Sequence, residues 1–277
     1  MTLLSNQQIQ QTLALAEQAG KEIMAFYDSG LDVQIKGDQS PVTQADFAAS
    51  SLLESALPDI ADYPVLSEEN IPNIPAWRNW PTYWLIDPVD GTKHFINGTG
   101  EFCICISLIC HNQVVFGLIF APATRTAWFA QKDEKSLVYK QKDNKIEQIA
   151  AKAPKTITAT LSSTHLTDNM QALLNYFPDY RWHRRGSALK YVDLIEGRAT
   201  LYPKMWDTCE WDSAAGQCLV ECAGGEVINF TTGRALSYGS RDSLVNPHFL
   251  AYCHLPKQQV KELLNCYQRL DIYSKIV

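Results

Sequence analysis

Two aspartates stand three positions apart at the end of an apolar run, a spacing that can bind a metal ion. Residues 83–86 read Tyr-Trp-Leu-Ile and predict a buried strand that stops at Asp87. The proline at position 88 keeps Asp87 extended, and the glycine at position 91 permits a tight turn. The carboxylates of Asp87 and Asp90 can then point into one small volume, with the Val89 carbonyl between them. Two like charges there need a cation, and oxygen ligands favour Mg²⁺ or Mn²⁺ over zinc.

The same turn has the features of a phosphate site. The N–H groups of Gly91 and Thr92 would open a helix and face an anion, as helix N-termini do. For this segment taken alone, an ordinary Asp-Pro-x-Asp-Gly turn on the surface is an equal alternative.

Three other segments supply acids and favour the metal site over the surface turn. Residues 64–69 are a second apolar run that ends in carboxylates, of which Glu68 is the first. The segment Trp-Asp-Ser-Ala-Ala-Gly places Asp212 at the head of a helix of small residues. Upstream, Thr43 and Asp46 form a helix N-cap pattern, in which the acid also complements the helix dipole. Taken singly, Asp46 is more simply a capping-box acid.

Together, these segments resemble the inositol monophosphatase family of Mg²⁺-dependent, lithium-sensitive phosphatases. The family's three signatures correspond, in the family's order, to Glu68-Glu69, residues 87–92 and residues 211–216. Within the family, the chain most resembles the bacterial 3'(2'),5'-bisphosphate nucleotidases. The motifs that carry this closer resemblance span almost the whole chain, at residues 40–43, 65–69, 90–93, 100–102, 186–190, 201–204 and 246–247.

The resemblance implies an α+β protein with layers in the order α-β-α-β-α and the site between its two halves. The residues themselves predict an amphipathic helix over 9–27 and a mostly antiparallel meander over 102–140. The lysine-rich segment 140–155 is the expected boundary between an N-terminal α+β subdomain (1–150) and a C-terminal α/β subdomain (151–277). The meander's strands are expected at 102–109, 114–120, 126–130 and 136–139; in the second half, strands near 157 and over 199–202 should alternate with helices over 187–196, 212–222 and 257–270.

By resemblance, Glu68, Asp87, Asp90, Asp212 and the Val89 carbonyl would hold two or three Mg²⁺ ions, for which Mn²⁺ can substitute. The charges agree, because about four carboxylates and a phosphate monoester can share one pocket only with such ions. One ion would lower the pKa of a bound water, and another would stabilise the leaving oxygen.

By resemblance, Thr92 and Asp46 would orient that water and help to deprotonate it, since a hydroxyl both donates and accepts. The alternative is that Thr92 only caps its helix.

The substrate would be bound by residues from both halves. Ser187 and Lys190 match a Gly-Ser-x-x-Lys segment of the nucleotidases, whereas the arginines at positions 181, 184 and 185 are equally well explained as a solvated face. Inositol-specific relatives have a glutamate at the position of Lys204, and a cation there favours a second phosphate. His165 is as often structural as substrate-facing. The substrate contacts implied by the resemblance are Gly91, Thr92, His165, Ser187, Lys190, Lys204 and Asp212.

Two segments depart from the nucleotidase pattern. His94 follows the Asp-Gly-Thr-Lys motif where the subgroup usually has glutamate, and residues 205–210 replace a loop that contains Gly-Pro. These changes bear on the geometry of the substrate loops and on the pH optimum, because histidine titrates near neutrality.

Composition narrows the classes of partner. The chain of 277 residues is 46% hydrophobic and has a net charge of −6, which argues against nucleic-acid polymers. We expect a cytoplasmic protein, because the N-terminus lacks a basic and apolar leader and no apolar run is long enough to span a bilayer. The eight scattered cysteines predict buried, reduced thiols. Peripheral membrane association and a homodimer remain open.

These observations predict Mg²⁺-dependent removal of the 3'-phosphate from adenosine 3',5'-bisphosphate, the by-product of sulfate activation. The first alternative is an inositol or sugar monophosphatase of the same fold. The second is a non-catalytic protein that binds phosphometabolites. The intact acids, Asp46 and Thr92 argue against the second alternative.

Overall fold

A seven-stranded sheet forms the centre of the N-terminal half of the molecule. The computed structural model describes residues 4–29, 33–35, 41–71, 75–150, 152–162 and 167–270. In spatial order the strands are β3 (Val65–Ser67), β4 (Thr82–Asp90), β5 (Cys103–Cys110), β6 (Gln113–Ala121), β7 (Thr126–Gln131), β8 (Val138–Lys142) and β9 (Lys145–Gln148). β3 pairs with β4 in parallel, and each later strand pairs antiparallel with its neighbour. The predicted meander is therefore confirmed, and β9 extends it by a strand that the sequence did not reveal.

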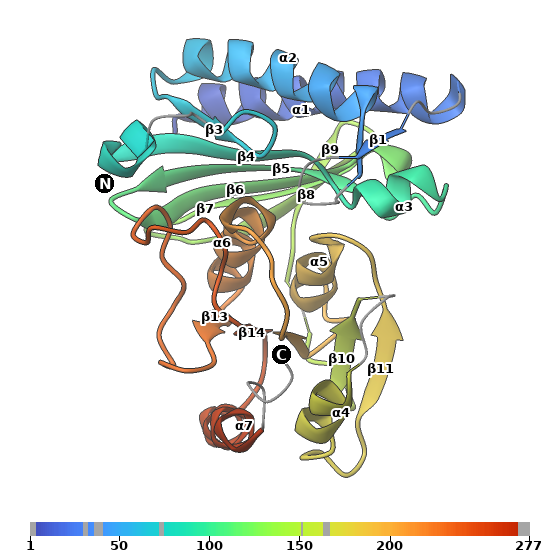
Figure 1. Ribbon diagram of the computed structural model, residues 1–277, viewed down its shortest axis with the longest axis vertical. Helices are drawn as coiled ribbons and strands as arrows, with labels where there is room; N and C mark the ends of the chain where they lie inside the picture. The colour runs from blue at the N-terminus through green and yellow to red at the C-terminus, as the bar shows by residue number, and fades with distance from the viewer. Residues whose placement is uncertain are drawn as a thin grey trace.

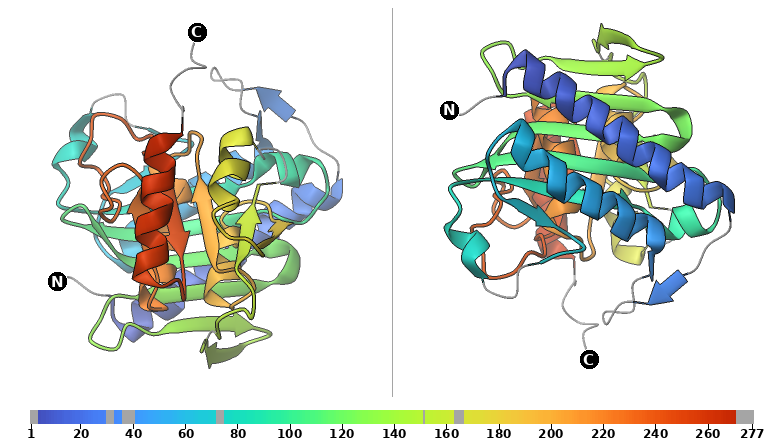
Figure 2. Two further views of the ribbon diagram at one scale, coloured as in Figure 1. Left: turned by 90° about the horizontal axis from the view of Figure 1, so that it is seen from below. Right: turned by 90° about the horizontal axis from the view of Figure 1, so that it is seen from above.

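Two long helices, α1 (Asn6–Ser29) and α2 (Gln44–Ile60), cover one face of this sheet (Figure 1; Figure 2, right). They form because apolar residues recur at spacings of three and four, and the inward positions Leu13, Ala16 and Ile23 are almost fully buried. A short ribbon of β1 (Val33–Ile35) and β2 (Pro41–Thr43) leads into α2. No helix among the described residues is long and apolar enough to cross a membrane.

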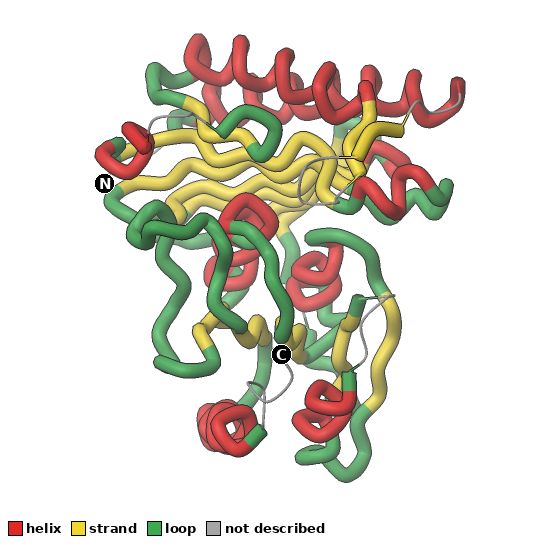
Figure 3. The backbone as a smooth tube through the Cα atoms, in the orientation of Figure 1, coloured by secondary structure: helices red, strands yellow, loops and turns green. Residues whose placement is uncertain are grey.

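The opposite face of the sheet packs on helices α5 (Leu189–Ile195) and α6 (Ala214–Cys222). Beyond them lies a five-stranded sheet, and α4 (Asp168–Leu174) and α7 (Lys257–Arg269) cover its outer face (Figure 2, left). Its strands, in spatial order, are β11 (Arg181–Arg184), β10 (Thr158–Leu161), β12 (Leu201–Lys204), β14 (Phe249–Tyr252) and β13 (Glu226–Asn229). The predicted layers α-β-α-β-α are thus confirmed, and Figure 3 shows the alternation of helix and strand.

Short helices complete the described chain: η1 (Pro75–Asn79), α3 (Thr92–Ile96), η2 (Pro122–Thr124) and η3 (Glu210–Asp212). The structure differs from the predicted elements of the second half. The charged segment after residue 180 is strand β11, and α5 begins at Leu189 because Ser187 has a left-handed φ of 52°. α6 begins after the turn η3 rather than at Asp212. The second sheet is also mixed rather than α/β throughout, since β13 and β14 pair antiparallel. The division at residue 150 remains a proposal.

A glycine lets helix α6 lie very close to the large sheet. A Cβ atom on Gly117 of β6 would lie 2.6 Å from the carbonyl oxygen of Ala215 and 2.7 Å from Cys218 Cβ. On the other side of the helix, a Cβ on Gly216 would lie 2.2 Å from the ring of Tyr191. α6 is therefore fixed between β6 and α5 by two positions where no side chain fits.

We expect Gly117→Ala to lower the free energy of unfolding by about 1–3 kcal/mol, because the added methyl must push α6 away from the sheet. Denaturant unfolding of the parent and the variant measures the difference. Gly224→Ala is the control: nothing lies within 4 Å of its added Cβ, so it carries only the cost of a left-handed residue, about 1 kcal/mol. Gly117→Val should lower the free energy of unfolding more than either alanine variant does. A larger loss of stability in Gly224→Ala than in Gly117→Ala would contradict the packing argument.

Candidate metal and phosphate site

The turn that carries the two aspartates is part of strand β4 and is buried. The β4–β5 register shifts between Asp87 and Asp90, so the intervening residues bulge out of the ladder. The N–H of Val89 donates to Asp87 Oδ1 at 3.0 Å, and the Asp87 side chain is 2% exposed. The alternative of an ordinary surface turn is therefore wrong.

Three acids from separate elements converge beside this bulge. Glu68 follows β3, Asp87 lies in β4, and Asp212 ends η3. Their carboxylate oxygens lie within 4.8 Å of one another. β3 and β4 are parallel, so their carboxyl ends meet at the same edge of the sheet, and η3 brings the third acid from the other half. The predicted acids Glu68, Asp87 and Asp212 are thus brought together, with Asp90 beside them.

The electrostatics of this cluster call for a cation. Burial raises the pKa of Asp87 well above its usual value, and the charges of Glu68, Asp90 and Asp212 raise it further. Burial also raises the pKa of Asp90 to about 6, with Asp212 adding to the effect and Lys190 opposing it. Carboxylates that repel one another in a dry site are stabilised by a hard divalent ion. The donor set therefore fits Mg²⁺ or Mn²⁺.

Asp212 is held by its own turn. Thr208 Oγ1 and the backbone N–H of Cys209 donate to Asp212 Oδ2, the latter at 2.7 Å. The side chain of Asn246 fixes the same turn, because its Nδ2 donates to the Cys209 carbonyl at 2.6 Å and to Ser213 Oγ at 2.9 Å. These bonds leave little freedom in the direction of the carboxylate.

The sequence reasoning missed an ion pair between a buried acid, Glu210, and the partly exposed Arg241. Glu210 is fully buried, accepts the Gly239 N–H at 2.7 Å and pairs with Arg241 Nη2 at 2.8 Å. Burial raises the pKa of Glu210 to about 7, against the lowering effects of the Gly239 N–H and Arg241. Glu210 stands next to a predicted motif, but its partner lies 31 positions further along the chain, which no local pattern reveals.

Asp46 and Thr92 meet as expected. Asp46 Oδ2 accepts the N–H of Thr43 at 2.8 Å in a capping box, while Thr92 Oγ1 lies 3.4 Å from Asp46 Oδ1 and 3.3 Å from the Val89 carbonyl. The N-cap of α3 is Gly91, which has a φ of 96°, so the alternative that Thr92 caps the helix is wrong. Asp46 is both the capping acid and the partner of Thr92.

A cleft of about 350 Å³ opens beside the acids. Most of the predicted substrate residues lie on its walls, whereas His165 is outside the described residues. The predicted residues that line the cleft are Glu68, Asp90, Gly91, Thr92, Ser187, Lys190, Lys204 and Asp212. Asp87 and Val89 lie in the buried floor, at 2% exposure each.

Lys190 braces the loop between β11 and α5. Its Nζ donates to the carbonyl of Ser187 at 2.6 Å and to that of Arg185 at 3.4 Å. The same loop returns to the acids through the Ala188 N–H, which donates to Asp90 Oδ2. Burial lowers the pKa of Lys190, and Asp90 is the first charge that opposes this lowering. Its ammonium therefore stabilises both the loop and the acid cluster.

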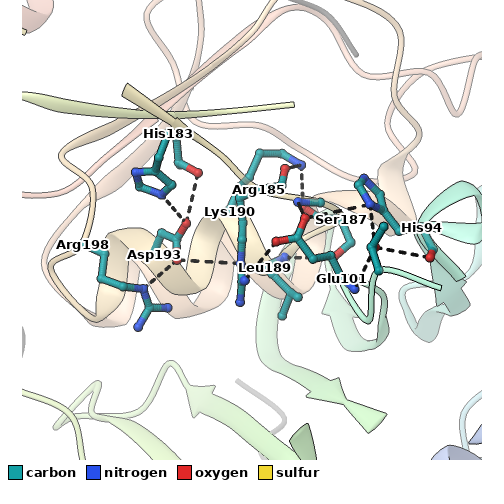
Figure 4. A network of polar contacts seen from close by, with 12 residues as sticks. His94, Glu101, His183, Arg185, Ser187, Leu189, Lys190, Asp193 and Arg198 are labelled. Carbon is teal, nitrogen blue, oxygen red and sulfur yellow. Dashed lines mark hydrogen bonds and ion pairs between the residues drawn. The ribbon is translucent and has the colours of Figure 1, made fainter. Parts of the chain in front are cut away.

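Polar contacts tie this loop to the other half of the molecule (Figure 4). Glu101 accepts from Arg185 Nη1 at 3.2 Å and from the Gly186 N–H at 2.9 Å. On α5, Asp193 pairs with His183 at 2.7 Å and with Arg198 at 2.8 Å. The predicted solvated face of arginines is only partly correct, because Arg185 is bound in this network.

Lys204 and Trp206 pack against each other in the cleft that the acids also line. Lys204 Nζ lies 4.6 Å from the centre of the Trp206 ring, and both side chains line the cleft. Burial and the charge of Lys190 lower the pKa of Lys204 to about 8, against the attraction of Asp212 and Asp90. The cleft is thus lined by both acids and cations. His94 also lines it, with Nδ1 3.0 Å from Thr99 Oγ1, and burial lowers its pKa.

Curated relatives of the chain are nucleotidases. Over 244 residues it is 35% identical to a 3'(2'),5'-bisphosphate nucleotidase CysQ of Escherichia coli K12, which covers 87% of this chain and 98% of that relative. The protein of the same name from Buchnera aphidicola is 37% identical over 246 residues, covering 86% and 90% of the two chains.

Solved structures and a family profile agree. CysQ from Bacteroides thetaiotaomicron, a bacterial member of the inositol monophosphatase family, is 30% identical and superposes with a TM-score of 0.74 over 87% of this chain and 95% of that chain. An IMPase from Thermotoga maritima, 22% identical, shares the fold with a TM-score of 0.76 over 94% and 97% of the two chains. The profile of the inositol monophosphatase family matches residues 5–269. The chain therefore belongs to the inositol monophosphatase family.

Proposed function

We propose that the protein is a Mg²⁺-dependent phosphatase that hydrolyses the 3'-phosphate of adenosine 3',5'-bisphosphate to AMP and phosphate. The observation that carries this proposal is one cleft that is lined both by the acids Glu68, Asp90 and Asp212 and by the cations Lys190 and Lys204. Support comes from the relatives named as 3'(2'),5'-bisphosphate nucleotidases. A cytoplasmic location and a role in sulfur metabolism belong to the same proposal.

The metal ligands in this proposal are the four acids and one carbonyl. Glu68, Asp87, Asp90, Asp212 and the Val89 carbonyl would hold two or three Mg²⁺ ions, with Mn²⁺ as a substitute. A structural neighbour, an IMPase/NADP phosphatase that is 17% identical, was solved with Mg²⁺ and phosphate. When bound, such ions supply positive charge to the phosphate and an acidic water. The bulge of β4 supports this assignment, because it lets one short segment offer two carboxylates.

Thr92 and Asp46 would manage the proton of the attacking water. Thr92 Oγ1 lies within donating distance of Asp46 Oδ1 and of the Val89 carbonyl, and Thr92 lines the cleft, so the hydroxyl can accept from a water there while it donates to Asp46. Asp46 is 1% exposed and fixed by the N–H of Thr43, which keeps its second oxygen directed at Thr92. A water held there can pass its proton toward Asp46 while it attacks phosphorus.

Lys204 would select nucleotides that carry a second phosphate. Its side chain lines the same cleft as the acids and their charges act on it, so its ammonium can pair with a phosphate that is bound there but not cleaved. Trp206 holds the lysine from one side and presents an aromatic surface to the cleft. An uncharged polyol would gain nothing from this cation.

We expect Mg²⁺ to raise the melting temperature at pH 7.5 and hardly at all at pH 5. The pKa values of Asp87 and Asp90 are raised in the folded protein, that of Asp90 to about 6, so without metal the fold binds extra protons and loses stability as the pH rises above about 4. Mg²⁺ binds the ionised acids and offsets this loss, by about 2.7 kcal/mol at one hundred times its Kd. Thermal melts with and without Mg²⁺ at both pH values measure the effect.

Two variants separate this effect from general salt stabilisation. Asp212→Asn should abolish most of the Mg²⁺-dependent shift, whereas Asp207→Asn removes an exposed acid of the same segment and should leave the shift in place. An equal Mg²⁺ shift at pH 5 and pH 7.5 would show that the clustered acids do not bind the metal.

Thr92→Ala should lower kcat by roughly 10²- to 10⁴-fold with little change in KM, because the lost proton transfer develops only toward the transition state. Steady-state kinetics with saturating Mg²⁺ measure the two constants. Thr92→Ser retains the hydroxyl and is the matched control. A rise in KM at unchanged kcat in Thr92→Ala would disprove the proton role.

The test of the substrate uses Lys204→Glu with adenosine 3',5'-bisphosphate and inositol 1-phosphate side by side. A charge-assisted contact is worth about 1.5–3 kcal/mol, so kcat/KM on the nucleotide should fall by roughly ten- to more than a hundred-fold while slower inositol 1-phosphate hydrolysis persists. Lys204→Met removes the charge without reversing it, so its kcat/KM on the nucleotide should lie between those of the parent and of Lys204→Glu. A parallel loss of kcat/KM on both substrates would favour the alternative of an inositol or sugar phosphatase. If the parent protein released no phosphate, the alternative of a non-catalytic binding protein would be favoured.

A further inference from the structure

Two cysteines lie beneath Asp90 on the neighbouring strand. Cys103 and Cys105 are two positions apart on β5, so both side chains point to the same face of the sheet. The β4–β5 register sets Asp90 opposite Cys103 and Asp87 opposite Cys105. An oxygen of the Asp90 carboxylate and the two Sγ atoms all lie within 4.8 Å of one another. Both thiols are reduced and almost fully buried.

This donor set differs chemically from the neighbouring acid cluster. Two thiols and one carboxylate suit Zn²⁺ or Cd²⁺, whereas Mg²⁺ avoids sulfur. Tetrahedral Zn²⁺ with bonds of about 2.3 Å to sulfur places two sulfurs about 3.8 Å apart. Donors already within 4.8 Å reach this spacing through small side-chain rotations.

Polar neighbours of the thiols agree with an ion-binding role. Cys103 Sγ lies 3.8 Å from Asp90 Oδ2 and 3.5 Å from Ser187 Oγ, so it faces polar groups rather than an apolar core alone. Ser187 and Asp90 line the cleft, which gives an ion a route from solvent. The ammonium of Lys190, whose pKa burial lowers while the nearby Asp90 and Cys103 oppose that lowering, lies close enough to balance the added negative charge.

We propose that Cys103, Cys105 and Asp90 form a binding site for a thiophilic divalent cation such as Zn²⁺, distinct from the cluster of Glu68, Asp87 and Asp212. On binding, each thiol releases its proton to solvent and coordinates as thiolate. Because Asp90 is shared, an ion at this site withdraws that carboxylate from the neighbouring metals. Zn²⁺ is therefore an inhibitor that acts from beneath the site.

The binding claim stands on the three donors alone, whereas the inhibition claim rests on the proposed function. The first test therefore uses no substrate. Metal-free protein, kept reduced, is titrated with Cd²⁺ and Co²⁺, and thiolate-to-metal charge-transfer absorption is recorded. The parent should develop this absorption to saturation, also in the presence of excess Mg²⁺. Its absence in the parent would overturn the site.

Matched serine variants identify the ligands. Cys103→Ser and Cys105→Ser, alone and together, should lose the absorption or weaken the affinity roughly tenfold or more, since metal sites lose much of their affinity with one soft ligand. Cys110→Ser is the control, because Cys110 lies on the same strand but packs in the core on the other face of the sheet. An equal effect in all three single variants would overturn the assignment, and thermal melts confirm that each variant folds.

The second test measures phosphate release in excess Mg²⁺ with increasing Zn²⁺. The parent and Cys110→Ser should be inhibited at similar Zn²⁺ concentrations, and the double serine variant should need roughly tenfold more. Equal inhibition of the double variant would place inhibitory Zn²⁺ at the acid cluster and overturn the coupling through Asp90. A parent that binds Cd²⁺ through thiolates but releases no phosphate would instead refute the proposed function and leave the site intact.

Discussion

Mutual repulsion among buried carboxylates is the constraint on which the arrangement of this molecule depends. Asp87 and Asp90 leave the same strand within one bulge, and Glu68 and Asp212 arrive from other elements. Each acid would be more stable in water, so the fold must hold them in place against their charges. The surroundings do this with bonds to the acids themselves: Asp212 accepts from its own turn, and Asp90 accepts from the loop that Lys190 braces.

The two halves of the molecule contribute opposite charges to the site. The large sheet supplies rigid strand ends, and these carry Glu68, Asp87 and Asp90. The second half supplies Lys190 and Lys204, whose charges reach the acids across the cleft. The clustered acids and the clustered lysines are each destabilised by repulsion between like charges. Bringing the two groups together stabilises both, and a polar cleft remains between them. That volume suits a ligand that is itself a strong anion bridged by cations.

Short motifs in the sequence were sufficient to pick out the acids and the pair of Thr92 and Asp46, and the layer order followed from the family resemblance that these motifs carry. Sequence reasoning failed where a structure depends on distant partners. Strand β11 carries mostly charged residues and is recognisable only through its pairing with β10. Glu210 can be buried because Arg241, far along the chain, pairs with it. The polar surroundings of Cys103 and Cys105 can be recognised only when the β4–β5 register is known. His165 remains a prediction.

The tight seating of α6 has a consequence for how a substrate enters. Gly117 lets β6 lie directly against the backbone of this helix on one side, and Gly216 lets the Tyr191 ring of α5 pack on the helix on the other. A hinge that swung the two sheets apart would have to separate these surfaces and open voids in a dense interior. We therefore expect the enzyme to admit its ligand without domain closure, through rearrangement of the rim segments around Trp206 and His94. Its catalytic cycle would then be limited by loop motion and ion exchange rather than by movement of whole subdomains.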